Sequence, residues 1–323
     1  MHRNKFVKTI LGTSMLITMD GFSSIAHAMS NTNKEKDNSS EFATFGAIHL
    51  NNTDLVKSTF FWTKIVGMKL RKVSGDSAEF GTEKQTLVVV HQTAKTSFKK
   101  GYSGLYHFAI HAPNKGEFAN MLYRLIANNY PFSPVDHTMS KSIYLDDPDG
   151  INIEFTLETP ERFKRVVTSG GLKIETTDGT IKSASAYLDV EEILKDVTDK
   201  DVSRIISKDT YLGHLHLYAN NVEKSNTFYK EIGFLPFNYL PQFMYADLGA
   251  GGAYKHRIAL NSWHGINKPI APSEHAGMKH FQIIFNSKEK LNQAIKNVSV
   301  YEEKDGGYCV YDATGNQIFL TNS

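Results

Sequence analysis

The chain has 323 residues, 41% of them hydrophobic and 22% charged, which is enough for a packed core spread over about two domains of ordinary size. Its net charge of +2 and the lack of a basic stripe with interleaved aromatic residues argue against a nucleic-acid partner. The single cysteine, Cys309, excludes an intramolecular disulfide and a thiolate zinc site, so any metal must be held by nitrogen and oxygen ligands, such as the 13 histidines.

The N-terminal segment differs in composition from the rest of the chain. A basic start is followed by a mostly apolar run over residues 10–19 and by Ala26-His27-Ala28, a pattern of the kind that signal peptidase cleaves. We predict a signal peptide over residues 1–28 and export of the protein; the alternative is a leader on a cytoplasmic protein. The apolar run is too short to cross a bilayer, so no stable membrane insertion is expected. The polar residues 29–41 are predicted to be a flexible linker.

An internal repeat organises the remainder of the chain. In two places a strand with alternating apolar residues leads into an amphipathic helix that carries an aromatic pair. Each helix ends at a glycine, Gly67 or Gly233, because glycine tolerates positive φ just past a helix. The predicted strands are 45–52 and 212–219, and the predicted helices are 54–66 and 222–232.

A second pair of segments follows the same plan and closes with a strand, a tight turn and a strand. Its predicted strands are 106–110 and 279–283, its helices 115–127 and 289–298, and its turns 146–150 and 312–316. The chain therefore holds four units that each read strand, helix and further strands. Between the second and third units, residues 190–206 show helical spacing of apolar residues and are predicted to form a connecting helix.

Three segments resemble the vicinal oxygen chelate superfamily, which includes glyoxalase I, bleomycin-resistance proteins and extradiol dioxygenases. They read GLYHFAI at 104–110, YLDDPDGINIE at 144–154 and GGAYKHRIALNSW at 251–263, and they are most similar to bacterial catechol 2,3-dioxygenases. The resemblance implies an α+β fold of four βαβββ modules arranged as two paired domains. Residues 42–160 would hold modules one and two, residues 210–323 modules three and four, and residues 161–209 would connect them.

In this superfamily a metal is held by a His on a module's first strand and a Glu on a module's last strand. In modules one to four the first-strand positions are Ala47, His107, His214 and His280, and the last-strand positions are Val89, Glu154, Ala259 and Phe319. The resemblance thus implies one site, formed by His107, His214 and Glu154 from modules two and three, and one degenerate site. Two histidines and one carboxylate form the facial triad of non-haem Fe(II) oxygenases, and Mn(II) accepts the same ligands. Glyoxalase I usually has a second Glu, for which Ala259 stands here, and its absence favours an oxygenase.

Each of these residues also has a simpler interpretation. Glu154 fits a solvent-facing Glu on an edge strand, and His107 fits a hydrogen-bonded core histidine. His214 competes with His216, which points to the same face of the strand. We expect His216 and its counterpart His49 to be packing or pocket residues, and His280 to be structural.

The resemblance also implies acid–base residues. His256 matches a family histidine on the third module, and its alternative role is that of a surface residue between Lys255 and Arg257. Tyr144 lies ten residues before Glu154, where its hydroxyl could bond a substrate oxygen, although it also fits a plain strand aromatic. His137 is either a substrate contact or a turn residue.

The favoured hypothesis is a metal-dependent extradiol dioxygenase that acts on a catechol or hydroquinone-type aromatic with O2. One alternative is a glyoxalase-like isomerase or lyase, and another is a non-catalytic protein that binds a small aromatic molecule. Export would count against an Fe(II) enzyme, because iron oxidises outside the cytoplasm. Modules two and three must meet either within one chain or across a homo-oligomer.

Overall fold

The computed structural model describes residues 41–323. The predicted signal peptide, 1–28, lies outside the described residues, and so does the predicted linker, 29–41, except for Glu41. This residue is buried and its carboxylate binds the Arg257 guanidinium, so Glu41 is part of the folded core. Among the described residues, no helix combines the length and apolar character needed to cross a bilayer.

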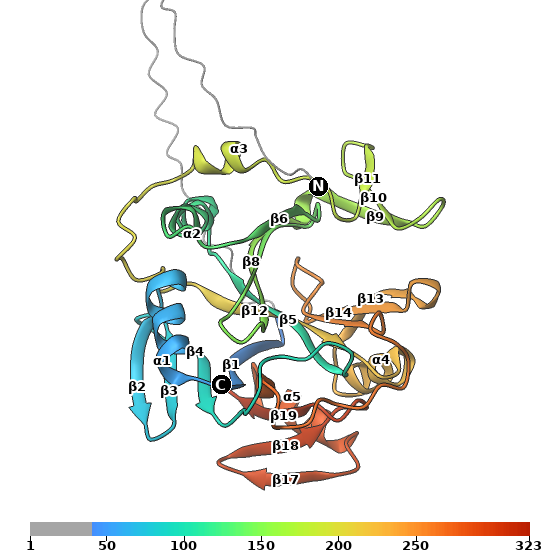
Figure 1. The fold of residues 1–323 in the computed structure, drawn as a ribbon. Helices are drawn as coiled ribbons and strands as arrows, with labels where there is room; N and C mark the ends of the chain where they lie inside the picture. The colour runs from blue at the N-terminus through green and yellow to red at the C-terminus, as the bar shows by residue number, and fades with distance from the viewer. Residues whose placement is uncertain (1–40) are drawn as a thin grey trace, which may run out of the picture. The chain divides into compact units, whose positions relative to one another are not determined.

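Four βαβββ modules follow one another along the chain, which confirms the predicted α+β fold (Figure 1). Module one consists of β1 (Ala43–Asn52), α1 (Leu55–Phe60), η2 (Phe61–Val66), β2 (Lys69–Ser74), β3 (Ser77–Gly81) and β4 (Thr86–Gln92). Module two consists of β5 (Gly104–His111), α2 (Lys115–Ala127), β6 (Ser133–Asp136), β7 (Ser140–Asp146) and β8 (Asn152–Glu158). Module three consists of β12 (Tyr211–Tyr218), α4 (Val222–Glu231), β13 (Leu235–Leu240), η4 (Pro241–Phe243), β14 (Tyr245–Gly249) and β15 (Ile258–Asn261). Module four consists of β16 (Gly277–Phe285), α5 (Lys288–Lys296), β17 (Tyr301–Lys304), β18 (Gly307–Tyr311) and β19 (Gln317–Asn322).

Local sequence signals account for the positions at which the module helices begin and end. Each starts after a capping side chain that accepts backbone N–H bonds, a residue type that stabilises helix starts. These caps are Asp54, Asn114, Asn221 and Ser287. The predicted stop at Gly67 is confirmed, because this glycine adopts φ +84° directly after η2.

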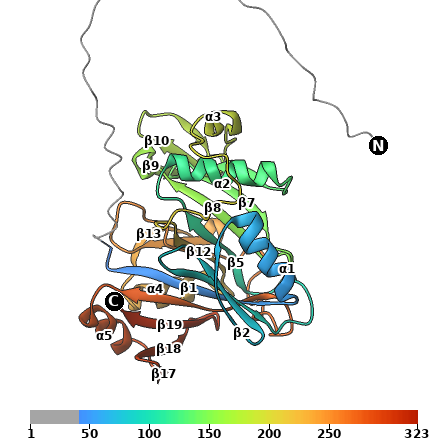
Figure 2. The same cartoon turned by 90° about the vertical axis from the view of Figure 1, so that its left-hand side faces the viewer.

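The segment between modules two and three departs from the prediction. It contains η3 (Pro160–Arg162), β9 (Phe163–Val167), β10 (Lys173–Thr176), β11 (Ile181–Ser183) and α3 (Val190–Leu194). The predicted helix over 190–206 was therefore too long. Beyond α3, the Asp199 and Asp201 carboxylates accept backbone N–H bonds two residues onward, and such local bonds replace helical ones. In Figure 2, α2 lies between α3 and the sheets.

The four modules form two eight-stranded sheets, and the pairs of modules are not the first two and the last two along the chain. One sheet joins modules one and four through antiparallel β1 and β16, and the other joins modules two and three through antiparallel β5 and β12. Modules two and three thus meet within one chain, and no second copy is needed. The pairing differs from the predicted division into 42–160 and 210–323, since each of these segments contributes one module to each sheet. The reason is that the first strands of modules two and three pair with each other, as do those of modules one and four.

The strand register is the same in all four modules. The first strand runs parallel to the last strand, and the residue opposite Val89, Glu154, Ala259 or Phe319 is His49, Ala109, His216 or Gln282 respectively. In each case the equivalent first-strand position lies two residues earlier, on the same face of the strand. The first-strand and last-strand positions that were aligned between the four modules by sequence therefore also occupy equivalent places in the structure.

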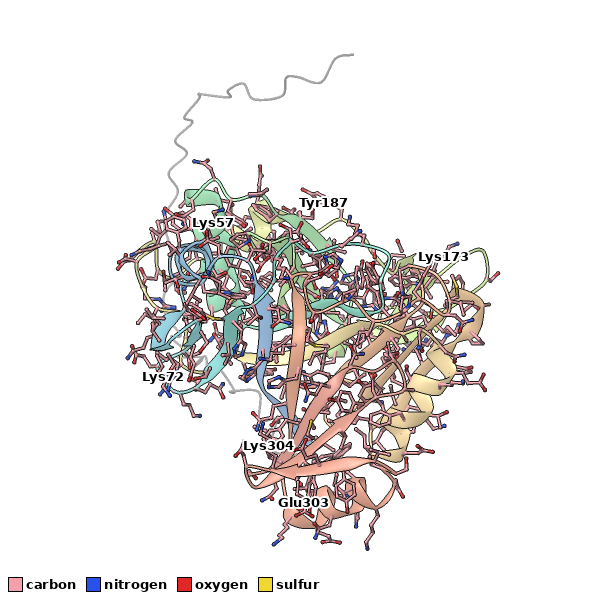
Figure 3. The ribbon with its side chains drawn as sticks, turned by 60° about the horizontal axis from the view of Figure 1, so that its bottom comes forward. Lys57, Lys72, Lys173, Tyr187, Glu303 and Lys304 are labelled. Carbon is pink, nitrogen blue, oxygen red and sulfur yellow. The ribbon has the colours of Figure 1, made fainter. Side chains whose placement is uncertain are left out.

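The core is built from the inner faces of the sheets and the helices that cover them. Trp62 in η2 is fully buried and packs against Phe80 of its own module and Phe108 of module two, which links the two sheets. Burying each such side chain stabilises the fold by about 1.5–3 kcal/mol. Charged side chains such as Lys72 and Lys304 point outward from the rim of the molecule (Figure 3).

Candidate metal centre

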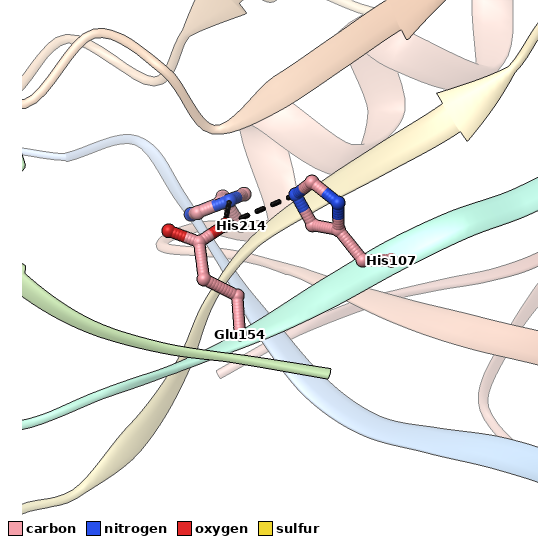
Figure 4. A group of neighbouring side chains, drawn as sticks. All are labelled: His107, Glu154 and His214. Carbon is pink, nitrogen blue, oxygen red and sulfur yellow. Dashed lines mark hydrogen bonds and ion pairs between the residues drawn. The ribbon is translucent and has the colours of Figure 1, made fainter. Parts of the chain in front are cut away.

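His107, Glu154 and His214 come together from three adjacent strands, β5, β8 and β12 (Figure 4). Their ligand atoms lie within 4.8 Å of one another, and all three side chains are buried. Glu154 is 1% exposed on a central strand, so the interpretation as a solvent-facing edge residue is wrong. Glu154 Oε2 lies 3.0 Å from His107 Nε2 and 3.1 Å from His214 Nε2.

A series of hydrogen bonds determines which nitrogen of His214 carries its proton. Burial alone would raise the pKa of Glu158, but the Arg257 guanidinium and the His111 ring lower it far below its usual value, so Glu158 accepts. Its Oε1 lies 2.9 Å from His111 Nδ1, which must donate. Burial lowers the pKa of His111, so the ring is neutral and its Nε2 accepts. That nitrogen lies 2.8 Å from His214 Nδ1, so His214 donates there and keeps the lone pair of Nε2.

The resulting arrangement fits a cation. Burial lowers the pKa of His214 well below its ordinary value, so its ring is neutral. Burial would raise the pKa of Glu154, but His214 and His107 hold it well below its usual range, so the carboxylate is ionised. Neither ring nitrogen of His107 makes a hydrogen bond of acceptable geometry. The Nε2 atoms of both histidines and Glu154 Oε2 therefore converge on one point, where a divalent metal would bind all three atoms in place of a proton between them.

Neighbouring residues hold these three side chains in place. Thr156 Oγ1 donates to Glu154 Oε1 at 2.9 Å, which leaves Oε2 facing the histidines. Gly213 makes room for the His111 ring, since a Cβ on this residue would lie 2.1 Å from His111 Cγ. Arg257 donates to Glu158 and to the Gly213 carbonyl, so the bonds around His214 extend to the backbone of its own strand.

His256 lies beside this group and has its own oriented partner. Its ring centroid is 4.9 Å from that of His214, and its Nδ1 lies 2.8 Å from Asp247 Oδ2. Asp247 also accepts bonds from the Tyr245 hydroxyl and from Asn238. The His256 Nδ1–H therefore points at Asp247, which leaves Nε2 as the basic nitrogen on this ring.

Tyr144 and His137 form a second oriented pair. Tyr144 lies directly opposite Glu154 in the β7–β8 register, and its ring packs against His107. Burial lowers the pKa of His137, whose Nδ1 donates to the Ala184 carbonyl at 2.7 Å. The His137 Nε2 therefore accepts from the Tyr144 hydroxyl at 2.9 Å. The lone pairs of that hydroxyl remain able to accept a bond from a bound molecule.

All six predicted site residues line one central pocket of about 650 Å³: His107, His137, Tyr144, Glu154, His214 and His256. Its lining comes from both edge strands of the sheet, β6 and β13, and from strands between them, so the sheet bends around the pocket. His216 lines it too, as expected for a pocket residue, and its Nε2 accepts from the Asn261 side chain. The structure thus brings together residues that lie up to 149 positions apart in the sequence, from His107 to His256.

The equivalent positions of the other sheet gather no such group. His280 stacks on His49 at 3.9 Å between centroids, and His49 Nδ1 lies 3.0 Å from His91 Nε2. Burial and the neighbouring histidines lower the pKa of His49 to about 3. No carboxylate joins these rings, and within residues 41–323 His107, Glu154 and His214 form the one metal-compatible group of His, Cys, Asp and Glu residues.

Three residues of the site were missing from the sequence analysis: Asp247, His111 and Glu158. Asp247 occupies in module three the position that Tyr144 has in module two, opposite the last strand, but its spacing along the chain differs. His111 and Glu158 were detectable. They lie four residues beyond His107 and Glu154 on strands that pair in parallel, so each shares a face with the predicted ligand.

Known proteins share this architecture. The family described as Glyoxalase/Bleomycin resistance protein/Dioxygenase superfamily matches residues 44–155. A Bacillus subtilis (strain 168) protein named catechol-2,3-dioxygenase is 27% identical over 270 residues, which cover 82% of this chain and 89% of that protein. The resemblance of the chain to this superfamily and to a bacterial catechol 2,3-dioxygenase is therefore confirmed.

Two solved structures share the fold. A candidate dioxygenase from Bacillus subtilis subsp. subtilis str. 168 superposes with a TM-score of 0.54 at 14% identity, covering 86% of this chain and 85% of that chain. A glyoxalase I variant from Zea mays gives a TM-score of 0.50 at 14% identity, covering 87% and 94%. At this identity both likenesses concern the fold alone.

Proposed function

We propose that this chain, which resembles the glyoxalase, bleomycin-resistance and dioxygenase superfamily, is a metal-dependent extradiol dioxygenase acting with O2 on a catechol or hydroquinone-type aromatic. The observation that carries the proposal is the buried group of His107, Glu154 and His214 between two oriented acid–base pairs. The relative named catechol-2,3-dioxygenase supports it.

His107, His214 and Glu154 would hold the metal, for which Fe(II) is our choice and Mn(II) the alternative. When bound, the ion would act as a Lewis acid toward the hydroxyl oxygens of the substrate and would bring the substrate and O2 together. The protein supplies a buried site in which Glu154 would be the one carboxylate among the ligands.

The Asp247–His256 and His137–Tyr144 pairs would then act on the protons of the substrate hydroxyls. His256, held by Asp247, presents Nε2 as the base that takes a proton from a substrate hydroxyl and later returns it. Tyr144 accepts a hydrogen bond from a substrate hydroxyl while its own proton stays on the His137 side. A ring placed between them is oriented from both sides.

The glyoxalase alternative requires a second Glu, and the equivalent position holds the buried Ala259. A purely binding protein would not require the Asp247–His256 and His137–Tyr144 pairs. Export through residues 1–28 and a homo-oligomeric state stay predictions.

The decisive experiment is anaerobic purification, metal analysis, reconstitution with Fe(II) or Mn(II), and oxygen uptake with catechol. The parent should consume oxygen and form a yellow ring-opened product, and Glu154→Ala should do neither. Stoichiometric metal without oxygen uptake on any catechol or hydroquinone would favour the isomerase alternative. A protein that binds no metal would leave the small-molecule binder.

A further inference from the structure

The three-stranded sheet β9–β11, here called the cover sheet, belongs to neither eight-stranded sheet. It is attached at one side to Asp136 at the end of β6, which binds Arg162 at 2.6 Å and Lys182 at 2.9 Å. The backbone of Asp136 also pairs with Ala186.

At its other side the cover sheet reaches β13, since the Phe163 ring packs on Phe237 at 5.3 Å between centroids. The strands β6 and β13 are the two edges of the sheet that bends around the central pocket. The cover sheet therefore spans the open side of that pocket, in agreement with its place beside β13 in Figure 1.

The face of the cover sheet that lines the pocket is apolar. Its strands contribute Phe163, Val166 and Ile174, and Leu172 joins them from the turn before β10. Side chains alternate between the faces of a strand, so Lys173 beside Ile174 points outward, as Figure 3 shows. Val135, Met139 and Leu240 from the main sheet complete this apolar end.

The pocket is larger than the proposed chemistry requires. Its volume of about 650 Å³ is typical of sites that take drug-sized ligands. A bare catechol, one ring with two hydroxyls, would occupy the polar end near Glu154 and leave the apolar end in contact with water. An apolar group attached to the ring would displace that water, which is favourable in proportion to the area buried.

Charged groups on the ring find no partner at this end. In the cover sheet Lys182 pairs with Asp136, Lys164 and Arg165 pair with Glu175, and Lys173 does not line the pocket; Arg162, just before β9, also pairs with Asp136. Among the lining residues, all of them described, the one Lys or Arg is the exposed Lys100. Burying a carboxylate without a partner is costly.

We propose that the cover sheet roofs an apolar subsite, and that the substrate is a catechol-type aromatic with an uncharged hydrophobic substituent seated beneath it. This inference rests on the proposed function, which sets the position of the ring. Discrimination between substrates then resides in Val166, Leu172 and Ile174, none of which lies on a strand that carries a proposed ligand.

The test compares catechol with 4-methyl-, 4-ethyl- and 4-butylcatechol, and with 3,4-dihydroxyphenylacetate as the charged counterpart. The Fe(II)-loaded full chain is used in two measurements: kcat/KM from oxygen uptake, and anaerobic binding by calorimetry. Affinity and kcat/KM should rise about fourfold for each buried methylene. The charged compound should fall below catechol in both.

Variants locate the subsite. Val166→Thr and Leu172→Ala should lower the advantage of butylcatechol over catechol about tenfold while catechol itself changes little. The matched control is Ile181→Thr, because Ile181 lies in the same cover sheet but is 53% exposed and does not line the pocket. Val166→Thr and Leu172→Ala change the side-chain volume by different amounts, so the test does not depend on one variant alone if the other misfolds.

The outcomes separate the subsite from the reaction. Oxygen uptake with catechol but a flat response to alkyl length would overturn the subsite and leave the dioxygenase. Graded anaerobic binding without oxygen uptake would support the subsite and overturn the dioxygenase. Equal effects of Ile181→Thr and Val166→Thr would also count against the assignment of the cover sheet.

Discussion

Modules two and three, and modules one and four, build sheets with the same strand order and the same register, yet their equivalent positions carry different side chains. Opposite Glu154 lies Tyr144, whereas the equivalent Phe319 of module four lies opposite Cys309. The first-strand histidine His107 corresponds to His280, which stacks on another ring instead of facing a carboxylate.

The comparison teaches that the same eight-stranded sheet is built with and without a group such as His107, Glu154 and His214. In the sheet of modules one and four, Val89 and Cys309 are buried at positions that would serve a ligand or an acid–base residue in the other sheet. Chemistry in this architecture therefore depends on a few side chains placed on a shared scaffold. Substitutions at equivalent positions of the two sheets can test whether the chemistry depends on these few side chains and not on the scaffold.

The largest effect is expected from the equivalent histidines. His107→Ala should lower Fe(II) affinity by more than the roughly 10- to 100-fold typical of residues that only orient a ligand, because it removes a proposed ligand. His280→Ala should leave the metal stoichiometry and oxygen uptake near parental values. Metal analysis after equilibrium dialysis measures both, and equal losses in the two variants would contradict the asymmetry between the sheets.

A smaller loss is expected at Glu158. Glu158→Gln keeps the shape of the side chain but can present an amide donor to His111, which would reverse the hydrogen bonds toward His214 and place a proton on its Nε2. Metal affinity should fall about 10- to 100-fold.

The control for this change is Glu41→Gln, which removes another buried partner of Arg257 but leaves the Glu158–His111 bond. Histidine ¹⁵N shifts of the metal-free protein should report a changed tautomer of His214 in Glu158→Gln alone. If Glu158→Gln lost metal affinity while the tautomer of His214 stayed the same, the loss would be due to altered folding and not to the hydrogen bonds.

Two equivalent glycines provide a third comparison. A Cβ at Gly213 would lie 2.1 Å from the buried His111 ring, whereas a Cβ at Gly46 would meet the end of the flexible Gln282 side chain. Gly213→Ala should therefore destabilise the fold by about 1–3 kcal/mol, as overpacking does, and weaken metal binding. Gly46→Ala should cost less and leave metal binding intact, which thermal melts and metal titration can establish.

These comparisons also show what could be predicted from sequence. Helix limits followed from local signals such as Gly67, and α2 matched its predicted range at both ends. The equivalence of His107 with His280 followed from the repeat, because strands alternate regularly and keep register over a module.

Long-range partners could not be predicted in this way. The resemblance implied that modules two and three meet, but local signals do not show that β5 and β12 pair within one chain, since these segments are about a hundred residues apart. The cover sheet carries only short, weakly patterned strands. Asp247 was missed because its distance along the chain from the last strand differs from that of Tyr144, although the two occupy equivalent places in the sheets.

The smallest effect concerns acid sensitivity in the sheet without the metal group. The pKa of His49 is lowered to about 3, first by burial and then by His280, His91 and Lys279, and the pKa of His280 is lowered to about 4. In the unfolded chain these rings regain the ordinary value of about 6.5. The unfolded state then binds more protons below that pH, so their contribution to stability is fully present above about pH 6.5 and is lost as the pH falls toward 3.

His49→Phe retains a flat ring for stacking but cannot be protonated, so the fall in Tm of the metal-free protein between pH 7 and pH 5 should be smaller than in the parent. His49→Gln, which is neutral but not aromatic, should show the same reduced dependence on pH at a lower overall Tm. The candidate metal centre is the same in all three proteins, so its contribution cancels in the differences. If both variants kept the parental dependence, the protonation of His49 would not be coupled to unfolding, and the acid sensitivity of the fold would come from other titratable groups.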